Sequence, residues 1–398
     1  MVFENCVVLV GPELSPMRCR RFAVQHDTIE AIDCIEQVVS IESGTRVIIP
    51  GLYNSHTHIG DACVPDGATG LSLEEGFFRP HGLKYRELAK LSPEEQQQSM
   101  CETLRYMSRT GTVCHLDFRE QARLGAELLR AASKTTGVES IILSQIDSVP
   151  YDVEELRENT QGMTPELSQE IEDILAVSDG LSESTMNEFT DHAWRTVYQM
   201  TKERGKLRAI HCLENEDYRK NSQRMSGVGD LARAINILKP HIIAHMTVAN
   251  TREIAALADS GITGVLNPRA NANLGLPLPP ISSLIKSNTN LLLGTDNGML
   301  NSPNMFAELD FTYKVAKSQG RDPKFPDPVR VLKMATSNIR KALGGDHYGS
   351  LEKGLPASFV VLDFHKPHLS RSRHIHASIT TRVTPNDIIA TYRLGRKL

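Results

Sequence analysis

Residues 50–62 read PGLYNSHTHIGDA and place two histidines two positions apart, directly after the β-branched run 47–49. A β-branched run bounded by proline and glycine is typical of a strand. A second extended stretch, residues 52–58, follows the turn. Because alternate residues of a strand point to the same face, His56 and His58 can reach one point, whereas on a helix they would diverge. The pair is either a binding site or two surface histidines near a turn, and the rest of the chain has to decide between them.

Composition narrows the class of protein. The chain has 398 residues, a formal net charge of −4 and 40% hydrophobic residues. This length suits two or three domains, or one large α/β barrel with an attachment. The slight negative charge and the absence of lysine and arginine blocks argue against nucleic acid as a partner. Seven scattered cysteines without a CxxC pair indicate a reducing compartment rather than a disulfide framework.

Targeting signals are not apparent in the sequence. The first residues lack a basic segment and a long apolar run, so no signal peptide is expected. No uncharged stretch of about 18 apolar residues occurs, which argues against a membrane span. We therefore expect a cytoplasmic protein with a small-molecule substrate and no membrane partner. The sequence leaves open whether the chain forms a homo-oligomer.

Hydrophobic periodicity divides the chain into three parts. Residues 1–49 and 344–398 alternate short apolar runs with turns, and the two segments are expected to pair into one small β-sandwich. Residues 50–343 alternate apolar runs with helical segments. Besides the strand that ends at His56, the expected strands are 112–116, 140–146, 174–178, 207–212, 242–245, 261–266 and 290–294. Eight β units, each followed by helical sequence, predict a parallel (β/α)8 barrel as the catalytic part of this α/β protein.

Side chains that can bind metals lie at the ends of several of these strands. His56 and His58 end the first unit, His211 the fifth, His245 the sixth and Asp296 the eighth, and Glu214 follows closely after His211. Barrel enzymes keep their active sites at the carboxyl ends of the strands. The first and last strands of a closed barrel are neighbours, so Asp296 should face His56 and His58. Together these residues predict one site.

The residue types in this set indicate a metal centre. Three imidazoles and a carboxylate suit one divalent cation such as Zn²⁺, with Fe²⁺ as the alternative. A metal that keeps one position for water makes hydroxide available near neutral pH. Glu214 and His245 would then handle protons and stabilise the transition state.

Several motifs resemble those of the amidohydrolase superfamily. VIIPGLYNSHTHIGD (47–61) is similar to its PGLxxxHxH opening, LGTDNGMLNSPNMFAEL (293–309) to its GTDGxxSNNxxNMFxEL segment, and GSLEKGLPASFVVLD (349–363) to its C-terminal signature. The match is to the mononuclear branch, which contains chlorohydrolases and nucleobase or nucleoside deaminases, including S-adenosylhomocysteine/methylthioadenosine deaminases. The resemblance covers nearly the whole chain. It implies that the metal ligands are His56, His58, His211 and Asp296, and that Glu214 and His245, together with Asp296, are catalytic.

The chain departs from the family pattern at places that bear on the site. Binuclear members carry a carboxylated lysine at the end of the fourth strand, whereas the expected fourth strand offers Ser178 and Asp179. One metal ion is therefore expected. The usual seventh-strand motif resembles NPxSNxxL, but here Ala270 follows Arg269 where a serine commonly lies. This departure leaves the specific substrate open.

Four residues are candidate substrate contacts, namely Arg269, Asn273, His81 and Asp117. Asp117 could instead pair with Arg119 and hold a loop. His81 lies near Phe77 and Phe78, whose rings could stack a planar substrate or pack on the rim of the barrel. The sequence does not separate these alternatives.

Three functions are compatible with the sequence. The first is a metal-dependent aminohydrolase, a deaminase that uses metal-bound hydroxide to release ammonia from a purine, pyrimidine, nucleoside or similar heterocycle. The second keeps the metal but changes the leaving group, as in a hydrolytic dechlorinase or a cyclic-amide hydrolase. The third is a non-catalytic binding relative, which is disfavoured because no catalytic position is lost. We favour deamination, since the glutamate of HxxE suits protonation of a ring nitrogen while ammonia leaves.

Overall fold

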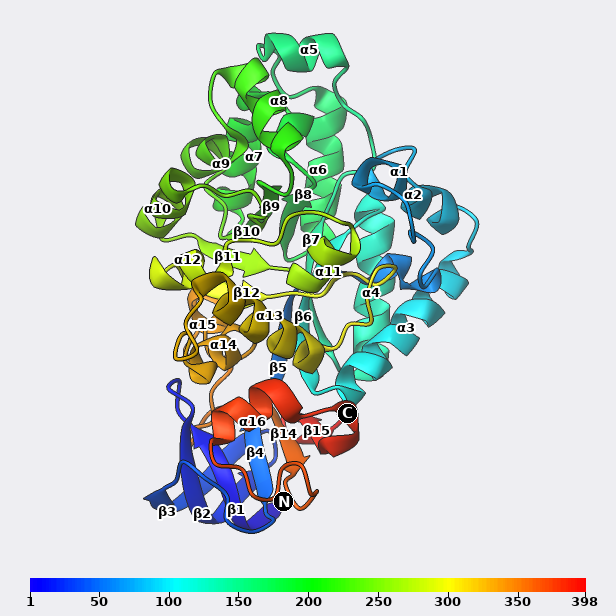
Figure 1. Cartoon of the computed structure of the whole chain (residues 1–398). Helices are drawn as coiled ribbons and strands as arrows, with labels where there is room; N and C mark the ends of the chain where they lie inside the picture. Colours follow the sequence, from blue (N-terminus) through cyan, green and yellow to red (C-terminus); the bar gives the residue numbers. More distant parts are fainter.

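A curled parallel sheet of nine strands, the large sheet, forms the upper part of the molecule (Figure 1). The computed structural model describes all residues from 1 to 398. In sheet order the strands are β12 (Leu291–Leu293), β11 (Thr263–Leu266), β10 (Ile242–His245), β9 (Leu207–Cys212), β8 (Gly180–Glu183), β7 (Glu139–Ser144), β6 (Thr112–Arg119), β5 (Leu52–His58) and β13 (Asp296–Asn297). Neighbouring strands are parallel, so their carboxyl ends lie along the same edge.

A short segment, residues 291–297, contributes strands to both ends of the large sheet. β12 pairs with β11, and β13, which begins after Gly294 and Thr295, pairs with β5. Asn54 donates to Thr295 Oγ1 at 2.7 Å and accepts from the Thr295 backbone N–H at 3.0 Å. A Cβ at Gly294 would lie 2.6 Å from the Cβ of His56, so only glycine allows the two strands to approach this closely. The chain thus brings Asp296 beside the histidines of β5.

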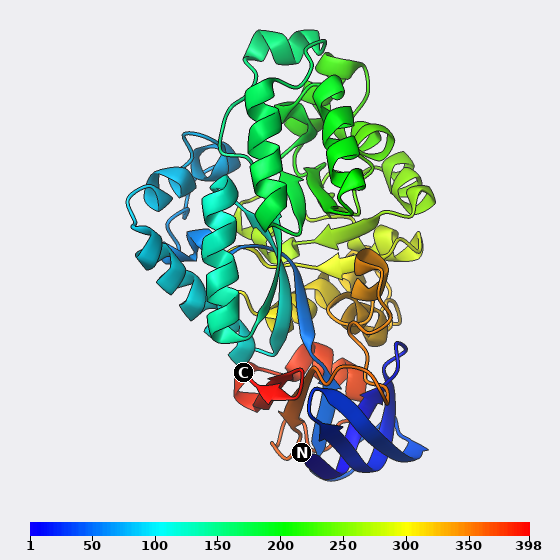
Figure 2. The same cartoon turned by 180° about the vertical axis from the view of Figure 1, so that it is seen from behind.

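The helices lie mostly on the outer side of the large sheet, except that the first two cover its carboxyl edge and the last lies beside the small sheet (Figures 1 and 2). They are α1 (Leu73–Phe77), α2 (Leu83–Leu88), α3 (Pro93–Arg109), α4 (Ala122–Thr136), α5 (Val153–Glu158), α6 (Pro165–Val177), α7 (Asp191–Glu203), α8 (Glu216–Ser226), α9 (Asp230–Arg233), α10 (Thr251–Ser260), α11 (Pro268–Asn273), α12 (Ile281–Lys286), α13 (Met305–Gly320), α14 (Pro328–Met334), α15 (Ile339–Leu343) and α16 (Ile375–Arg382). Their apolar faces pack with the strands in a core that includes the fully buried Trp194 of α7. None of these helices has the length and apolar character that a membrane crossing requires.

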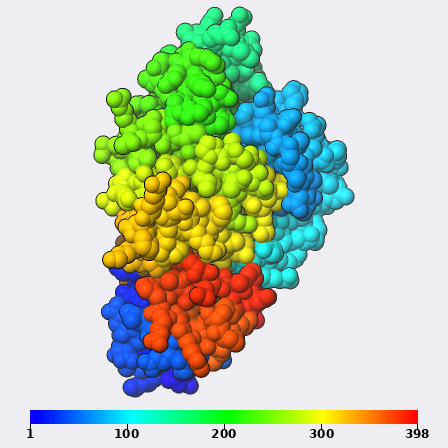
Figure 3. All heavy atoms as spheres, viewed as in Figure 1, coloured from blue at the N-terminus to red at the C-terminus, as the bar shows by residue number.

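The two ends of the chain form a second sheet of seven strands, the small sheet, where both termini lie (Figure 2). Its order is β16 (Arg396–Lys397), β15 (Ile388–Arg393), β14 (Phe359–Asp363), β4 (Arg46–Pro50), β1 (Val2–Val10), β2 (Ser15–Gln25) and β3 (Thr28–Gln37). β4 is the central link, because it pairs with β1 on one side and with β14 on the other. The two ends of the chain lie side by side at the bottom of the molecule (Figure 3).

Two expectations from the sequence need correction. The apolar run 174–178 is not the fourth strand: residues 174–177 form the end of α6, and the fourth strand is β8. The run ILAV fits the buried face of a helix as well as a strand, and a strand of four residues gives only a weak signal. The chain ends, expected to form a β-sandwich, pair into one continuous sheet, of which one face packs on its own apolar cluster and the other on the main core.

Substitution of Ile48 by alanine tests the role of β4. Ile48 is fully buried and lies opposite Val8 of β1 and Val361 of β14. Ile48→Ala should lower the free energy of unfolding by about 2–5 kcal/mol, because a buried cavity replaces the lost side chain. Ile35→Ala is the matched control: Ile35 lies on β3 with 56% of its surface exposed, and its change should be within about 0.5 kcal/mol. Equal losses in urea denaturation would contradict this view of the small sheet.

Candidate metal centre

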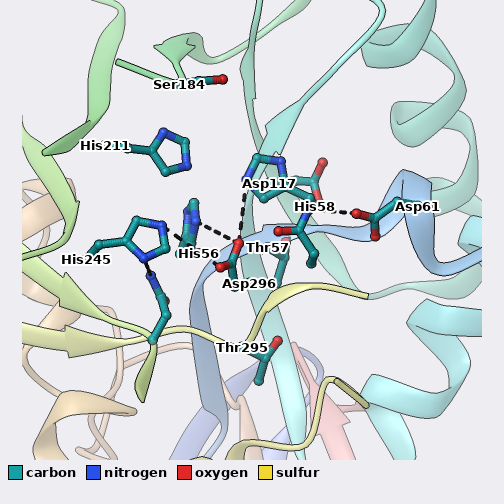
Figure 4. A network of polar contacts seen from close by, with 12 residues as sticks. His56, Thr57, His58, Asp61, Asp117, Ser184, His211, His245, Thr295 and Asp296 are labelled. Carbon is teal, nitrogen blue, oxygen red and sulfur yellow. Dashed lines mark hydrogen bonds and ion pairs between the residues drawn. The ribbon is translucent and has the colours of Figure 1, made fainter. Parts of the chain in front are cut away.

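Four side chains from three strands meet at the carboxyl edge of the large sheet (Figure 4). His56 and His58 lie on β5, His211 on β9, and Asp296 begins β13. The nearest ligand atoms of the three histidines lie within 4.8 Å of one another. Asp296 Oδ1 lies 3.2 Å from His56 Nε2 and 3.7 Å from His58 Nε2, so Asp296 faces both histidines, as the sequence predicts.

Hydrogen bonds on the outer side orient two of the imidazoles. His58 Nδ1 lies 2.7 Å from Glu120 Oε1, and His211 Nδ1 lies 2.8 Å from the carbonyl oxygen of Glu183. An acceptor at Nδ1 requires the ring to carry its proton there, which leaves Nε2 as a free lone pair. Both rings therefore present a metal-ligating nitrogen to the centre.

His56 gives the direct test of whether these residues fit a metal. Its side chain is fully buried, and neither ring nitrogen makes a hydrogen bond. Burial, and then the neighbouring His58, lower the pKa of His56 well below its ordinary value, so the ring is neutral. A buried polar atom without a partner is rare in folded proteins. A divalent cation would give His56 Nε2, the nitrogen that faces Asp296, a partner. The donor set of imidazoles and a carboxylate suits such an ion.

Aromatic packing closes the inner side of the centre. Phe118 of β6 contacts three of the histidine rings, with centroid distances of 4.2 Å to His56, 5.1 Å to His211 and 5.9 Å to His58. Phe118 is not among the site residues that the sequence predicts. Its place inside the strand motif CHLDFRE, between two polar positions, is the only signal that could have indicated it.

Glu214 and His245 border the same centre. His245 Nε2 lies 3.7 Å from Glu214 Oε1 and 3.9 Å from Asp296 Oδ2. Burial lowers the pKa of His245 to about 3, so its ring is neutral. Burial, and then the charge of Asp296, raise the pKa of Glu214 to about 8. Glu214 is thus a carboxyl that holds its proton at neutral pH.

The backbone is strained at two of these positions. His245 has a φ of 79° and Asp296 a φ of 65°, both in the left-handed region that residues other than glycine rarely adopt. Such strain costs about 1–3 kcal/mol per residue and clusters at functional sites. The fold maintains it because these conformations aim both side chains into the centre.

A small cavity lies above the centre. Its volume is about 30 Å³, which holds only one or two water molecules. Its lining combines the residues of the centre with an aromatic and apolar cover, namely His58, Leu73, Phe77, Phe78, Lys84, Ser184, His211, Glu214, Tyr218, His245, Asp296 and Asn297. Lys84 and Tyr218 were not anticipated, because they lie on helices without a site motif.

The four candidate substrate contacts do not line this cavity. Asp117 is fully buried and accepts hydrogen bonds from Thr57 Oγ1 at 2.8 Å and from the Ile59 N–H at 2.9 Å. His81 is exposed on the connection between α1 and α2.

The other two candidates lie on α11. The Arg269 N–H donates to Glu308 at 3.1 Å, and Asn273 donates to the Leu300 carbonyl at 2.7 Å. All four therefore stabilise the surroundings of the site or face solvent in this structure. A role in substrate binding would require these segments to move.

Comparisons with known proteins agree with this geometry. Residues 47–398 match the model of the amidohydrolase family. A candidate aminohydrolase of Methanothermobacter thermautotrophicus is 34% identical over 366 residues, which cover 91% of each chain. The chain belongs to the amidohydrolase family. A 5-methylthioadenosine/S-adenosylhomocysteine deaminase of Acetivibrio thermocellus is 27% identical over 338 residues, covering 83% of this amidohydrolase and 75% of that protein.

The fold has a counterpart among solved structures. A zinc-bound adenosine deaminase from Xanthomonas campestris superposes with a TM-score of 0.82 at 22% identity, covering 100% of this amidohydrolase and 92% of that chain. At that identity the likeness concerns the fold. In this amidohydrolase the fourth strand, β8, ends in Glu183 and is followed by Ser184. No lysine lies there, so the reason to expect a single metal ion remains although the strand was misplaced.

Removal of one ligand tests the metal centre. Protein purified without chelator should contain about one equivalent of a divalent metal per chain by elemental analysis, and His56→Ala should lower this content, because a site that loses a ligand binds metal more weakly. His192→Ala replaces an exposed histidine of α7 and should leave the metal content unchanged. Two equivalents per chain, or full content in His56→Ala, would contradict the assignment.

Proposed function

We propose that this amidohydrolase is a metal-dependent aminohydrolase that removes ammonia from an amino-substituted nitrogen heterocycle. His56, His58, His211 and Asp296 hold the metal, and Glu214, His245 and Asp296 are the catalytic residues. The family membership and the deaminase named among the relatives support a carbon–nitrogen hydrolase. The observation that carries the proposal is the buried carboxyl of Glu214, which lies 3.7 Å from His245 and borders a histidine cluster that can hold a metal ion.

Zinc is the metal we propose. Imidazole nitrogens with one carboxylate oxygen are ligands that Zn²⁺ prefers, and the solved adenosine deaminase of similar fold binds zinc. When bound, the ion lowers the pKa of water enough to supply hydroxide near neutral pH. Both His56 and His211 are neutral in this environment, because burial lowers the pKa of each well below its ordinary value. They therefore bind a cation without first losing a proton.

Glu214 is the proton donor in this mechanism. When water oxygen adds to the ring carbon that bears the amino group, electrons move onto the adjacent ring nitrogen, which then needs a proton. Glu214 carries one at neutral pH, since burial and the charge of Asp296 raise its pKa to about 8. The carboxylate that results accepts a proton from the attacking water and passes it to the departing amine.

His245 and Asp296 complete the proton and charge handling. The Asp296 carboxylate accepts the first proton of the attacking water and returns it to Glu214 after ammonia leaves, so that both residues end in their starting form. His245 Nε2 lies 3.9 Å from Asp296 Oδ2 and 3.7 Å from Glu214 Oε1, so it faces the position between the two carboxyls. From there the ring hydrogen-bonds the new oxygen substituent and stabilises its charge.

We also propose a closed (β/α)8 barrel and a division into two domains. The pairing of β12 with β11 and of β13 with β5 supports closure through one interrupted eighth strand. Residues 50–343 would form the catalytic barrel. Residues 1–49 and 344–398 would form the second domain, which contains the small sheet.

Glu214→Gln tests the proton donor. The variant should retain its metal, because Glu214 is not a ligand, and should lose turnover by about 10²–10⁴, the usual effect of removing a positioned acid–base group. Glu216→Gln, a change at a largely exposed glutamate two residues away, should retain full turnover. Near-full activity of Glu214→Gln on the true substrate would show that the mechanism is wrong.

The pH dependence of turnover provides a second test. The acid form of Glu214 is the active form, so kcat should fall as the pH rises through the pKa of Glu214, at about pH 8. In Glu214→Gln this alkaline limb should be absent from the residual rate, since the amide does not titrate. A wild-type profile that stays flat through this range would exclude Glu214 as the proton donor.

An ammonia-release screen over purines, pyrimidines, pterins and nucleosides identifies the substrate. We expect ammonia from at least one aminated heterocycle, at a rate that depends on the bound metal and on Glu214. Chlorinated heterocycles and cyclic amides belong in the same screen, because a dechlorinase or a cyclic-amide hydrolase would use the same residues. Turnover restricted to one of those substrates would overturn the deaminase assignment.

A further inference from the structure

The cavity above the metal centre is covered by residues 64–91, here named the cover segment, which contains α1 and α2. Leu73, Phe77 and Phe78 of this segment line the cavity. Pockets for small ligands usually measure about 300–1,000 Å³, against about 30 Å³ here. A heterocycle therefore enters only if lining residues move, and four of the twelve lining residues belong to the cover segment, so the contacts that hold this segment down matter for function.

Lys84 of α2 links the cover segment to a metal ligand. Its Nζ lies 2.7 Å from Glu120 Oε1, and the same oxygen lies 2.7 Å from His58 Nδ1. The other carboxylate oxygen, Oε2, contacts the guanidinium of Arg119. Glu120 is thus held at both oxygens, and one of them is shared between the lysine and the ligand histidine.

This chain of contacts is dry and charged. The Lys84 and Glu120 side chains are 4% and 0% exposed. Oε1 of Glu120 accepts from Lys84 Nζ and Oε2 contacts the Arg119 guanidinium, and both of these cations can only donate. Glu120 is therefore a carboxylate, an acceptor only, and His58 must donate from Nδ1. Without Lys84, the carboxylate would be drawn toward Arg119 and away from His58.

We propose that Glu120 and Lys84 are positioning residues for the metal ligand His58, and that the cover segment, through Lys84, sets the metal affinity of the centre. Lys84 makes no hydrogen bond or ion pair with the proposed ligands, and its contact route to His58 runs through Glu120. The inference rests on the metal centre of the proposed function. Acceptors that hold the outer nitrogen of a ligating histidine commonly contribute about 10–100-fold in metal affinity.

Zinc affinity of the metal-free protein, measured by competition with a chromophoric chelator, tests this proposal without any substrate. Glu120→Gln should raise the Kd for zinc by about 10–100-fold. Lys84→Met should raise it in the same direction, by no more than Glu120→Gln. Lys90→Met is the matched control, because Lys90 lies in the same segment and pairs with Glu87 at 2.6 Å on the surface. Its Kd should equal that of the wild type.

The double variant Lys84→Met/Glu120→Gln separates positioning from a general loss of stability. If Lys84 acts only through Glu120, the double variant should bind zinc as weakly as Glu120→Gln alone. Multiplied effects of the two changes would overturn the proposal, as would a wild-type Kd in Lys84→Met. Lys84→Gln, which keeps an N–H donor for Glu120, should recover part of the affinity.

Thermal unfolding of each metal-free variant accompanies the titrations. Where Lys84→Met does not fold, the Kd for zinc of Lys84→Gln is compared with that of Lys90→Met. Equal Kd values for these two variants would overturn the proposal. A wild-type chain that binds no zinc would overturn the proposed metal centre itself, and this inference with it. A wild-type chain that binds zinc while Lys84 variants are unaffected would overturn this inference alone.

Discussion

The pairing of β13 with β5 is the constraint on which the site depends. It places the last strand segment of the large sheet beside the first, and Asn54 and Thr295, 241 positions apart in the sequence, exchange two hydrogen bonds there. Gly294 permits the approach because any larger residue would meet His56. This junction brings the Asp296 carboxylate to the Nε2 side of the paired histidines of β5. The same junction holds Asp296 in its strained backbone conformation.

Burial determines the chemistry of the groups that this junction assembles. Histidines removed from water stay neutral, and neutral imidazoles are the form that binds a cation. Burial acts in the opposite direction on Glu214, which keeps its proton at neutral pH. The same burial therefore keeps the ligand histidines free of a positive charge and keeps the proton on the carboxyl of Glu214. The polar groups that remain are oriented by Glu120 and by the backbone of β8.

The cover segment explains how a site this dry can still belong to an enzyme. In the closed arrangement its aromatic and apolar residues exclude water, which strengthens electrostatic interactions inside. The cover is attached by buried cations as well as by apolar packing: Arg79 lies 3.0 Å from Glu183, and Lys84 lies 2.7 Å from Glu120. Both carboxylates belong to residues that also hold a ligand histidine. Access to the site and the geometry of its ligands are therefore connected.

The sequence by itself determined the α/β alternation and the residues at the strand ends, because periodicity and turn chemistry are local properties of the chain. The spacing of His56 and His58 on an extended segment belongs to this local information. Whether these residues meet Asp296 was decided by the tertiary structure, through the pairing of the first and last strands. The expected position of the fourth strand was wrong because a short buried run is compatible with helix and strand alike, and local sequence cannot separate the two. Nothing in the sequence relates Glu120 to Lys84, and only packing brings them together: two charges removed from water require partners, and the fold supplies each with the other.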